Sequence, residues 1–272
     1  MLYLLIVLAV LLLIATLYVL STCCRRGHRE LQKLHGWNYA HRGLHGNGVP
    51  ENSLQAFQRA VEAGYGSELD VHLLADGNLA IMHDSPLKRT TGADGVIEDL
   101  TTEQLSNFRL EETNETIPLL ADVLTLYNGK APLIVELKPV GNNTAELCEK
   151  VCALLDNYRG VYCIESFDPR CVRWFRKHRP DIIRGQLTED FFKSPTSKLP
   201  GVIKFIMKHQ LTNFLTYPDF IAYRFSDRNT ISNTLCRKLW KASMVSWTLI
   251  SQQEYDTAVR EGWIPIFEGF NP

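Results

Sequence analysis

The chain has 272 residues, of which 45% are hydrophobic and 22% charged, a composition typical of a globular protein with a sizeable core. Its 29 basic and 30 acidic residues give a net charge of −1, which argues against a nucleic-acid-binding protein and against a disordered acidic one. The seven cysteines lack the spacing of a disulfide framework and are typical of a reducing compartment.

Residues 1–22 contain no charged side chain and are long enough, as a helix, to cross a bilayer. A cleaved signal peptide and a lipoprotein signal ending before Cys23 are the alternatives, but the basic start that both require is missing. We therefore expect a single-pass transmembrane helix over residues 1–22 and a juxtamembrane linker over residues 23–37. Basic residues follow the helix and none precedes it, so the positive-inside rule predicts that the rest of the chain lies in the cytoplasm.

Beyond residue 37, apolar runs of strand character alternate with helical patterns. The predicted strands are Asn38–Arg42, Glu68–Leu73, Leu79–His83, Leu133–Lys138, Val161–Ser166, Ile182–Leu187, Asn213–Pro218, Met244–Ile250 and Ile264–Phe267. Helices are predicted from Ser53, Thr101, Thr144, Pro169 and Gln253. This alternation predicts an α/β fold with a mostly parallel sheet, and the length suits one (β/α)₈ barrel or two small domains. Residues 189–212 are expected to be an irregular insertion that caps one end.

Acidic residues gather at the ends of two predicted strands. Glu68 and Asp70 are two apart and share one face of their strand, as Glu136 and Lys138 do on another. If both faces point inward, three carboxylates converge, and burying them together without a cation would be costly. Carboxylate oxygens are the ligands that Mg²⁺ and Ca²⁺ prefer, with Mn²⁺ as a third candidate. We therefore expect Glu68, Asp70 and Glu136 to bind one divalent cation.

Two histidines extend this pattern. His41 and His83 each end a predicted strand, so both can face the same mouth of the fold. Two imidazoles can act as general base and general acid, while Arg42 and Lys138 supply positive charge to a phosphate in its transition state. Taken singly, each residue has a plainer explanation, as part of a solvated strand face or as a structural histidine. Taken together, they predict hydrolysis of a phosphate ester.

Six short motifs occur in the order and at about the spacing found in one enzyme family. They are His41-Arg42-Gly43, Pro50-Glu51-Asn52-Ser53, Glu68-x-Asp70, His83-Asp84, Thr91-Gly92 and Glu136-x-Lys138. With Ser166-Phe167-Asp168 and Trp247-Thr248, they make residues 38–262 resemble the glycerophosphodiester phosphodiesterase family. The resemblance implies a TIM (β/α)₈ barrel over residues 38–272 that hydrolyses glycerophosphodiesters to glycerol 3-phosphate and an alcohol.

The resemblance also implies a role for each matched residue. Glu68, Asp70 and Glu136 match the metal ligands, and His41 and His83 match the acid–base pair. The remaining matches are near the substrate: Arg42 and Lys138 at the phosphate, Phe167 and Trp247 at the glycerol. Alternatives stay open for several of them. Glu51 and Asn52 either support the site or only begin the next helix, Lys138 pairs either with phosphate or with Glu136, and the two aromatic residues contact either substrate or core.

The C-terminal segment departs from the family pattern, because Glu261-Gly262-Trp263 and the residues after it replace the family's usual final strand. This departure leaves the substrate open between a soluble glycerophosphodiester and a membrane lysophospholipid, the substrate of a lysophospholipase D. A phospholipase C or sphingomyelinase D on a similar barrel is another enzymatic alternative. A membrane-tethered protein that binds phosphodiesters without hydrolysing them is the non-enzymatic one.

Overall fold

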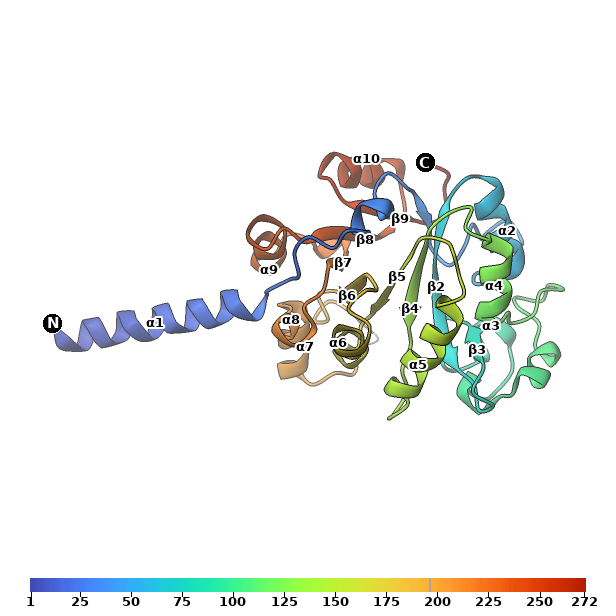
Figure 1. Cartoon of the computed structure of the whole chain (residues 1–272), viewed down its shortest axis with the longest axis horizontal. Helices are drawn as coiled ribbons and strands as arrows, with labels where there is room; N and C mark the ends of the chain where they lie inside the picture. Colours follow the sequence, from blue (N-terminus) through green and yellow to red (C-terminus); the bar gives the residue numbers. More distant parts are fainter. Residues whose placement is uncertain (196) are drawn as a thin grey trace.

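The computed structural model describes residues 1–195 and 197–272. Within these residues, eight parallel strands close into a barrel with helices around it (Figure 1). The barrel strands are β1 (Tyr39–Ala40), β2 (Gly66–Leu73), β4 (Leu133–Leu137), β5 (Tyr162–Ser166), β6 (Arg184–Thr188), β7 (Phe220–Arg224), β8 (Ser243–Leu249) and β9 (Ile264–Phe267). They pair in chain order, and β9 pairs with β1 to close the ring. The predicted TIM barrel is confirmed.

Strand alternation decides which side chains reach the barrel axis. Along β2, Leu69 and Val71 point outward into a core that also contains residues of the surrounding helices. Glu68 and Asp70, the alternate residues of the same strand, therefore point inward. Parallel pairing places Asp70 opposite Glu136 of β4. The same pleat that buries the apolar residues therefore brings the carboxylates together.

The surrounding helices follow the sequence patterns closely. The longer ones are α2 (Leu54–Glu62), α4 (Leu120–Tyr127), α5 (Thr144–Leu155), α6 (Pro169–His178), α7 (Gly201–Lys208) and α10 (Gln252–Arg260). The short helical turns are α3 (Lys88–Thr91), α8 (Asn213–Thr216), α9 (Ile231–Thr234), η1 (Leu31–Leu34), η2 (Ile97–Asp99), η3 (Thr102–Asn107), η4 (Phe225–Asp227) and η5 (Leu235–Leu239). At the start of α2, the Ser53 hydroxyl accepts a hydrogen bond from the Ala56 amide at 3.1 Å, as its capping position predicts.

Three predicted elements need correction. The predicted strand Asn213–Pro218 is wrong: residues 213–216 form α8, and the strand is the next apolar run, Phe220–Arg224. Short apolar runs do not distinguish strand from buried helix, and here two stood side by side. The predicted strand Leu79–His83 ends at Ile81 as β3 (Leu79–Ile81), which pairs antiparallel to the end of β2 and lies outside the barrel. The predicted irregular insertion 189–212 contains a regular helix, α7.

The segment predicted as a linker packs against the barrel. Leu31 and Leu34 are buried with Tyr39, Ile134 and Phe220, residues at or near the amino ends of barrel strands. The guanidinium of Arg25 donates to the buried carboxylate of Asp219 at 2.6 Å. Residues 23–37 therefore close the amino-terminal end of the barrel.

The first helix, α1 (Leu2–Ser21), extends away from the barrel (Figure 1). An 18-residue stretch of this 20-residue helix has a mean hydropathy of 2.9, and no residue of the helix is buried by the described protein. The helix is long and apolar enough to cross a membrane, although a signal sequence has the same character.

Candidate active site

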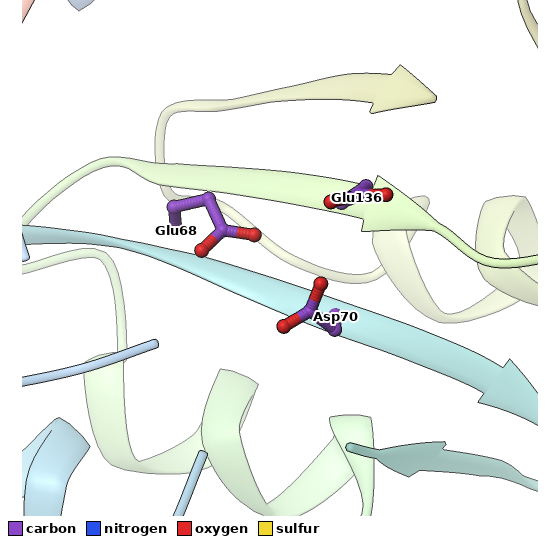
Figure 2. A group of neighbouring side chains, drawn as sticks. All are labelled: Glu68, Asp70 and Glu136. Carbon is purple, nitrogen blue, oxygen red and sulfur yellow. The ribbon is translucent and has the colours of Figure 1, made fainter. Parts of the chain in front are cut away.

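The three acidic residues converge between the neighbouring barrel strands β2 and β4. Glu68 and Asp70 extend from β2 toward Glu136 of β4 (Figure 2). One carboxylate oxygen from each lies within 4.8 Å of the other two, and all three side chains are buried. The carboxyl ends of the strands form the catalytic face of such barrels, because the longer loops meet there.

The charges of this cluster are strongly unbalanced. Burial raises the pKa of Glu68 well above its usual value, and the neighbouring carboxylates of Asp70 and Glu136 raise it further. Burial also raises the pKa of Glu136 to about 7. Burial alone would raise the pKa of Asp70, but the charges of Lys138, His83 and Arg42 outweigh it and hold that pKa well below its usual range. The three groups are therefore not all stable as anions without further positive charge.

A divalent cation fits this donor set. The Oε1 atom of Glu68 is buried and has no hydrogen-bond partner among the described residues. The nearest positive charge is the Lys138 ammonium, 2.9 Å from Asp70 Oδ1 and 2.7 Å from Glu136 Oε1. Three carboxylates beside one ammonium and the more distant Arg42 guanidinium leave room for a hard cation with oxygen ligands. The residues predicted as metal ligands are thus gathered with unused acceptor capacity.

His41 is held by a residue that the sequence analysis did not select. Its Nδ1 atom lies 2.5 Å from the carboxylate of Glu268, which follows β9, and its Nε2 atom lies 3.8 Å from Glu68. The hydrogen bond to His41 lowers the pKa of Glu268 to about 2. Burial lowers the pKa of His41, and the bond to Glu268 only partly offsets this. A carboxylate on Nδ1 fixes the ring and leaves Nε2 facing the acidic cluster.

His83 is held in a comparable way by its neighbour. Its Nδ1 atom lies 2.6 Å from the carboxylate of Asp84. Burial, followed by the charge of Lys138, lowers the pKa of His83. His83 does not end a barrel strand as predicted. The chain turns back after β2, and the Met82 amide donates to the Asp70 carbonyl at 3.1 Å, which brings His83 beside the cluster.

Polar residues outside the cluster position its members. Asn52 donates to Asp70 Oδ2 at 2.8 Å, and Arg42 donates to Glu51 at 2.9 Å. Glu51 also accepts two hydrogen bonds from Arg89, whose guanidinium also contacts Asp84. Ser53, rather than Glu51 or Asn52, caps α2. Of the two explanations left open for Glu51 and Asn52, the geometry favours support of the site.

These groups surround a cavity of about 160 Å³ at the mouth of the barrel. His41, Arg42, Glu68, His83 and Glu136 line one part of it. Phe167 and Trp247 line another part, with ring centroids 5.6 Å apart and an edge-to-face arrangement. The two predicted aromatic residues therefore reach the cavity, although both also contact the barrel core.

Glu165 also lines the cavity and was missed by the sequence analysis. Glu165 lies on β5, paired in register with Glu136 of β4. Burial raises the pKa of Glu165 well above the usual value. The only sequence signal was its position directly before Ser166-Phe167. An acidic residue alone at a strand end is too common to be selected on that basis.

A barrel whose mouth combines buried carboxylates, two histidines and two basic side chains is typical of metal-assisted hydrolases. The model of the glycerophosphoryl diester phosphodiesterase family matches residues 41–235. A glycerophosphodiester phosphodiesterase of Bacillus altitudinis is 37% identical over 175 residues, which are 60% of this chain and 71% of that protein. A lysophospholipase D of Rattus norvegicus is 32% identical over 144 residues, 48% of this chain and 44% of that protein.

Among solved structures, an Oleispira antarctica phosphodiesterase in complex with the product sn-glycerol-3-phosphate has the same fold. It is 22% identical with a TM-score of 0.70, over 85% of this chain and 92% of that one. The chain belongs to the glycerophosphoryl diester phosphodiesterase family. It is accordingly a hydrolase of the phosphodiesterase class.

Proposed function

We propose that the protein hydrolyses glycerophosphodiesters to glycerol 3-phosphate and an alcohol with the help of one divalent cation. The observation that carries this proposal is the cluster of three carboxylates beside a cavity that two oriented histidines line. Mg²⁺ and Ca²⁺ are the first candidates for the cation, and Mn²⁺ is the third, because each prefers oxygen ligands. Glu68, Asp70 and Glu136 would hold the cation.

The cation, when bound, offsets the negative charge of the phosphate and of its transition state. Arg42 and Lys138 add positive charge on the same side, since both already contact Asp70, at 3.5 Å and 2.9 Å. Phe167 and Trp247 offer an apolar wall to the carbon skeleton of the glycerol. Glu51 and Asn52 keep Arg42 and Asp70 in place.

His41 and His83 divide the two proton transfers. One neutral imidazole takes a proton from the nucleophile, which is water or the 2-hydroxyl of the glycerol. The other, as an imidazolium, gives a proton to the leaving alkoxide, so that the P–O bond breaks to release a neutral alcohol. Attack by the 2-hydroxyl gives a cyclic phosphate, which water then opens. Both rings are held through Nδ1 by a carboxylate, which leaves Nε2 available for this work.

We infer further that α1 anchors the enzyme in a membrane and that the barrel lies on the cytoplasmic side. Support comes from the apolar character of α1 and from the basic residues that follow it. We divide the chain into an anchor over residues 1–22, a connection over residues 23–37 that packs on the barrel, and the barrel over residues 38–272. Protease accessibility of the barrel in sealed vesicles tests the orientation.

Lysophospholipase D activity is the second candidate function. The anchor would hold the barrel beside lysophospholipids, and the relative from Rattus norvegicus carries that name. The full chain in detergent, assayed with glycerophosphocholine and lysophosphatidylcholine with and without EDTA, separates these functions. We expect hydrolysis of at least one substrate, its loss in EDTA and its recovery with Mg²⁺, Ca²⁺ or Mn²⁺. Absence of turnover with every cation would favour a binding protein.

A further inference from the structure

Large apolar side chains are exposed on the helices that meet the end of α1. We call this surface the apolar collar. It consists of Val202, Ile203 and Phe205 on α7, Phe214 and Leu215 on α8, and Leu239 on η5. Val202 is 71% exposed and Phe214 is 49% exposed. An apolar surface of this kind on a soluble domain marks an interaction site.

The collar is fixed in position relative to α1. Tyr18, in the last turn of α1, lies 3.0 Å from the His209 ring that follows α7. Thr22 receives hydrogen bonds from Asn213 of α8 at 3.4 Å and from the Trp240 indole at 3.2 Å. Figure 1 shows α7, α8 and α9 near the point where α1 leaves the barrel. If α1 crosses a bilayer, the collar therefore lies at the surface of that bilayer.

The side chains around the collar have the chemistry of a membrane interface. Arg176 lies over the Tyr217 ring at 4.8 Å and donates to the Phe214 carbonyl. Arg26 lies over the Trp240 ring at 5.8 Å. Aromatic rings and arginines are enriched where a protein passes from lipid to water, and basic groups attract anionic headgroups. Against a second copy of the chain the same arginines would repel one another, so the observations favour lipid.

We propose that the apolar collar inserts into the bilayer interface beside α1 and binds the barrel to the membrane along α7 and α8. This inference rests on the membrane anchoring proposed above and adds a second point of attachment. A helix that lies in the interface with its apolar side chains among the acyl chains is a known mode of binding. With two points of attachment, α1 and the collar, the barrel would be held at the membrane in one orientation.

The collar also connects to the active site through the β6–α7 loop. Phe191 in this loop packs edge-to-face on Phe167, which lines the cavity, at a centroid distance of 6.0 Å. The next residue, Phe192, is exposed and lies under the Lys208 ammonium of α7. Phe191 thus packs behind a residue of the cavity wall, and Phe192 contacts the helix that carries part of the collar.

The test measures lipid contact at three matched positions in the full chain, in nanodiscs of phosphatidylcholine and phosphatidylserine. Val7→Cys places a probe in α1, Val202→Cys one in the collar and Val140→Cys one before α5. The native cysteines are all buried, so an added exposed thiol is labelled preferentially with an environment-sensitive fluorophore. Quenching by nitroxide-labelled lipid then reports contact with the bilayer. We expect strong quenching at positions 7 and 202 and none at position 140.

The outcomes separate the collar from the anchor. Quenching at position 7 without quenching at position 202 overturns the collar and leaves the anchor intact. No quenching at position 7 overturns the anchor itself. A blue-shifted but unquenched probe at position 202 means that protein, such as a second copy, covers the collar, and this also overturns the proposal.

A charged substitution provides a functional readout. We expect Val202→Asp to lower the hydrolysis of lysophosphatidylcholine in the nanodisc several-fold, because the collar no longer holds the barrel at the lipid surface. Hydrolysis of soluble glycerophosphocholine by the same preparation should be unchanged, which also shows that the variant is folded. Val140→Asp is the matched control. Equal loss on both substrates would contradict a role in membrane docking.

Discussion

At the level of single residues, the hydrogen bond between His41 and Glu268 is a contact that could not be predicted from the sequence. Glu268 lies 227 positions from His41 along the chain, and barrel closure through β9 and β1 brings the two together. The C-terminal segment departs from the family pattern, and no residue in it was predicted to belong to the site. The acidic residues on β2 and β4 were predictable, because alternation and strand order determine their direction.

We predict that Glu268→Gln lowers kcat by roughly tenfold to a hundredfold while KM changes little. The substitution removes the charge that stabilises the His41 imidazolium and its orientation, but leaves the cavity lining in place. Glu261→Gln is the control, since Glu261 pairs with Arg228 at 3.0 Å outside the cavity. Equal kcat values for wild type and Glu268→Gln would remove Glu268 from the mechanism.

Replacing either histidine should lower kcat more than replacing Glu268. We expect His41→Ala and His83→Ala each to lower kcat by at least about a hundredfold, the usual contribution of a general acid or base. Circular dichroism and the midpoint of thermal unfolding should remain close to those of the wild type. A wild-type rate in either variant would exclude that residue from proton transfer.

In the acidic cluster, we predict that a substitution raises the stability of the cation-free protein and weakens cation binding. Without a cation, Glu68→Gln should raise the thermal unfolding midpoint, because it replaces a carboxyl whose ionisation is opposed by burial and by the neighbouring carboxylates. Added Mn²⁺ should raise the midpoint of the wild type and have little effect on the variant. The measurement is differential scanning fluorimetry across a Mn²⁺ titration. The same Mn²⁺-dependent rise in both proteins would show that Glu68 does not bind the cation.

At the scale of elements, the sequence predicted the alternation of strands and helices better than their roles. Seven of the barrel strands overlap predicted ones, whereas β7 was assigned to the preceding run, residues 213–218. The predicted strand that holds His83 formed only β3, an antiparallel addition to β2. Local patterns do not encode strand partners, so neither the antiparallel pairing nor its effect on His83 was available from the sequence.

One glycine shows how tightly the strands approach each other. A Cβ atom at Gly185 of β6 would lie 2.1 Å from the Phe220 ring of β7. We predict that Gly185→Ala lowers the free energy of unfolding by about 1–3 kcal/mol, the usual cost of overpacking a core. Gly201→Ala is the control, since a Cβ atom there meets no described atom within 4 Å. Urea unfolding of both variants checks this, and equal stability would contradict it.

At the scale of the whole molecule, the amino-terminal segment is part of the folded barrel and does not act as a free tether. Leu34 is 1% exposed and packs at the amino-terminal end of the barrel. We predict that Leu34→Ala lowers the free energy of unfolding by about 2–5 kcal/mol, as expected for a buried leucine. Leu199→Ala, at a position that is 40% exposed, should change it much less. Equal effects in urea unfolding would mean that residues 23–37 do not support the barrel.

The N-terminal segments follow one another from α1 to the active-site end of the barrel. Helix α1 leads into residues 23–37, which close the amino-terminal end of the barrel. These residues lead into β1, and β1 leads into His41 at the opposite end. Residues that come from β1, β2, β4 and the segment after β9 then meet at a single mouth. The proposed active site therefore forms only when the barrel is closed.

The most direct test is a crystal structure of the protein grown with Mn²⁺, with anomalous scattering used to locate the ion. We predict one strong anomalous peak bonded to carboxylate oxygens of Glu68, Asp70 and Glu136, with His41 and His83 facing the same cavity. An ion bound elsewhere, with these three carboxylates left without metal, would contradict it.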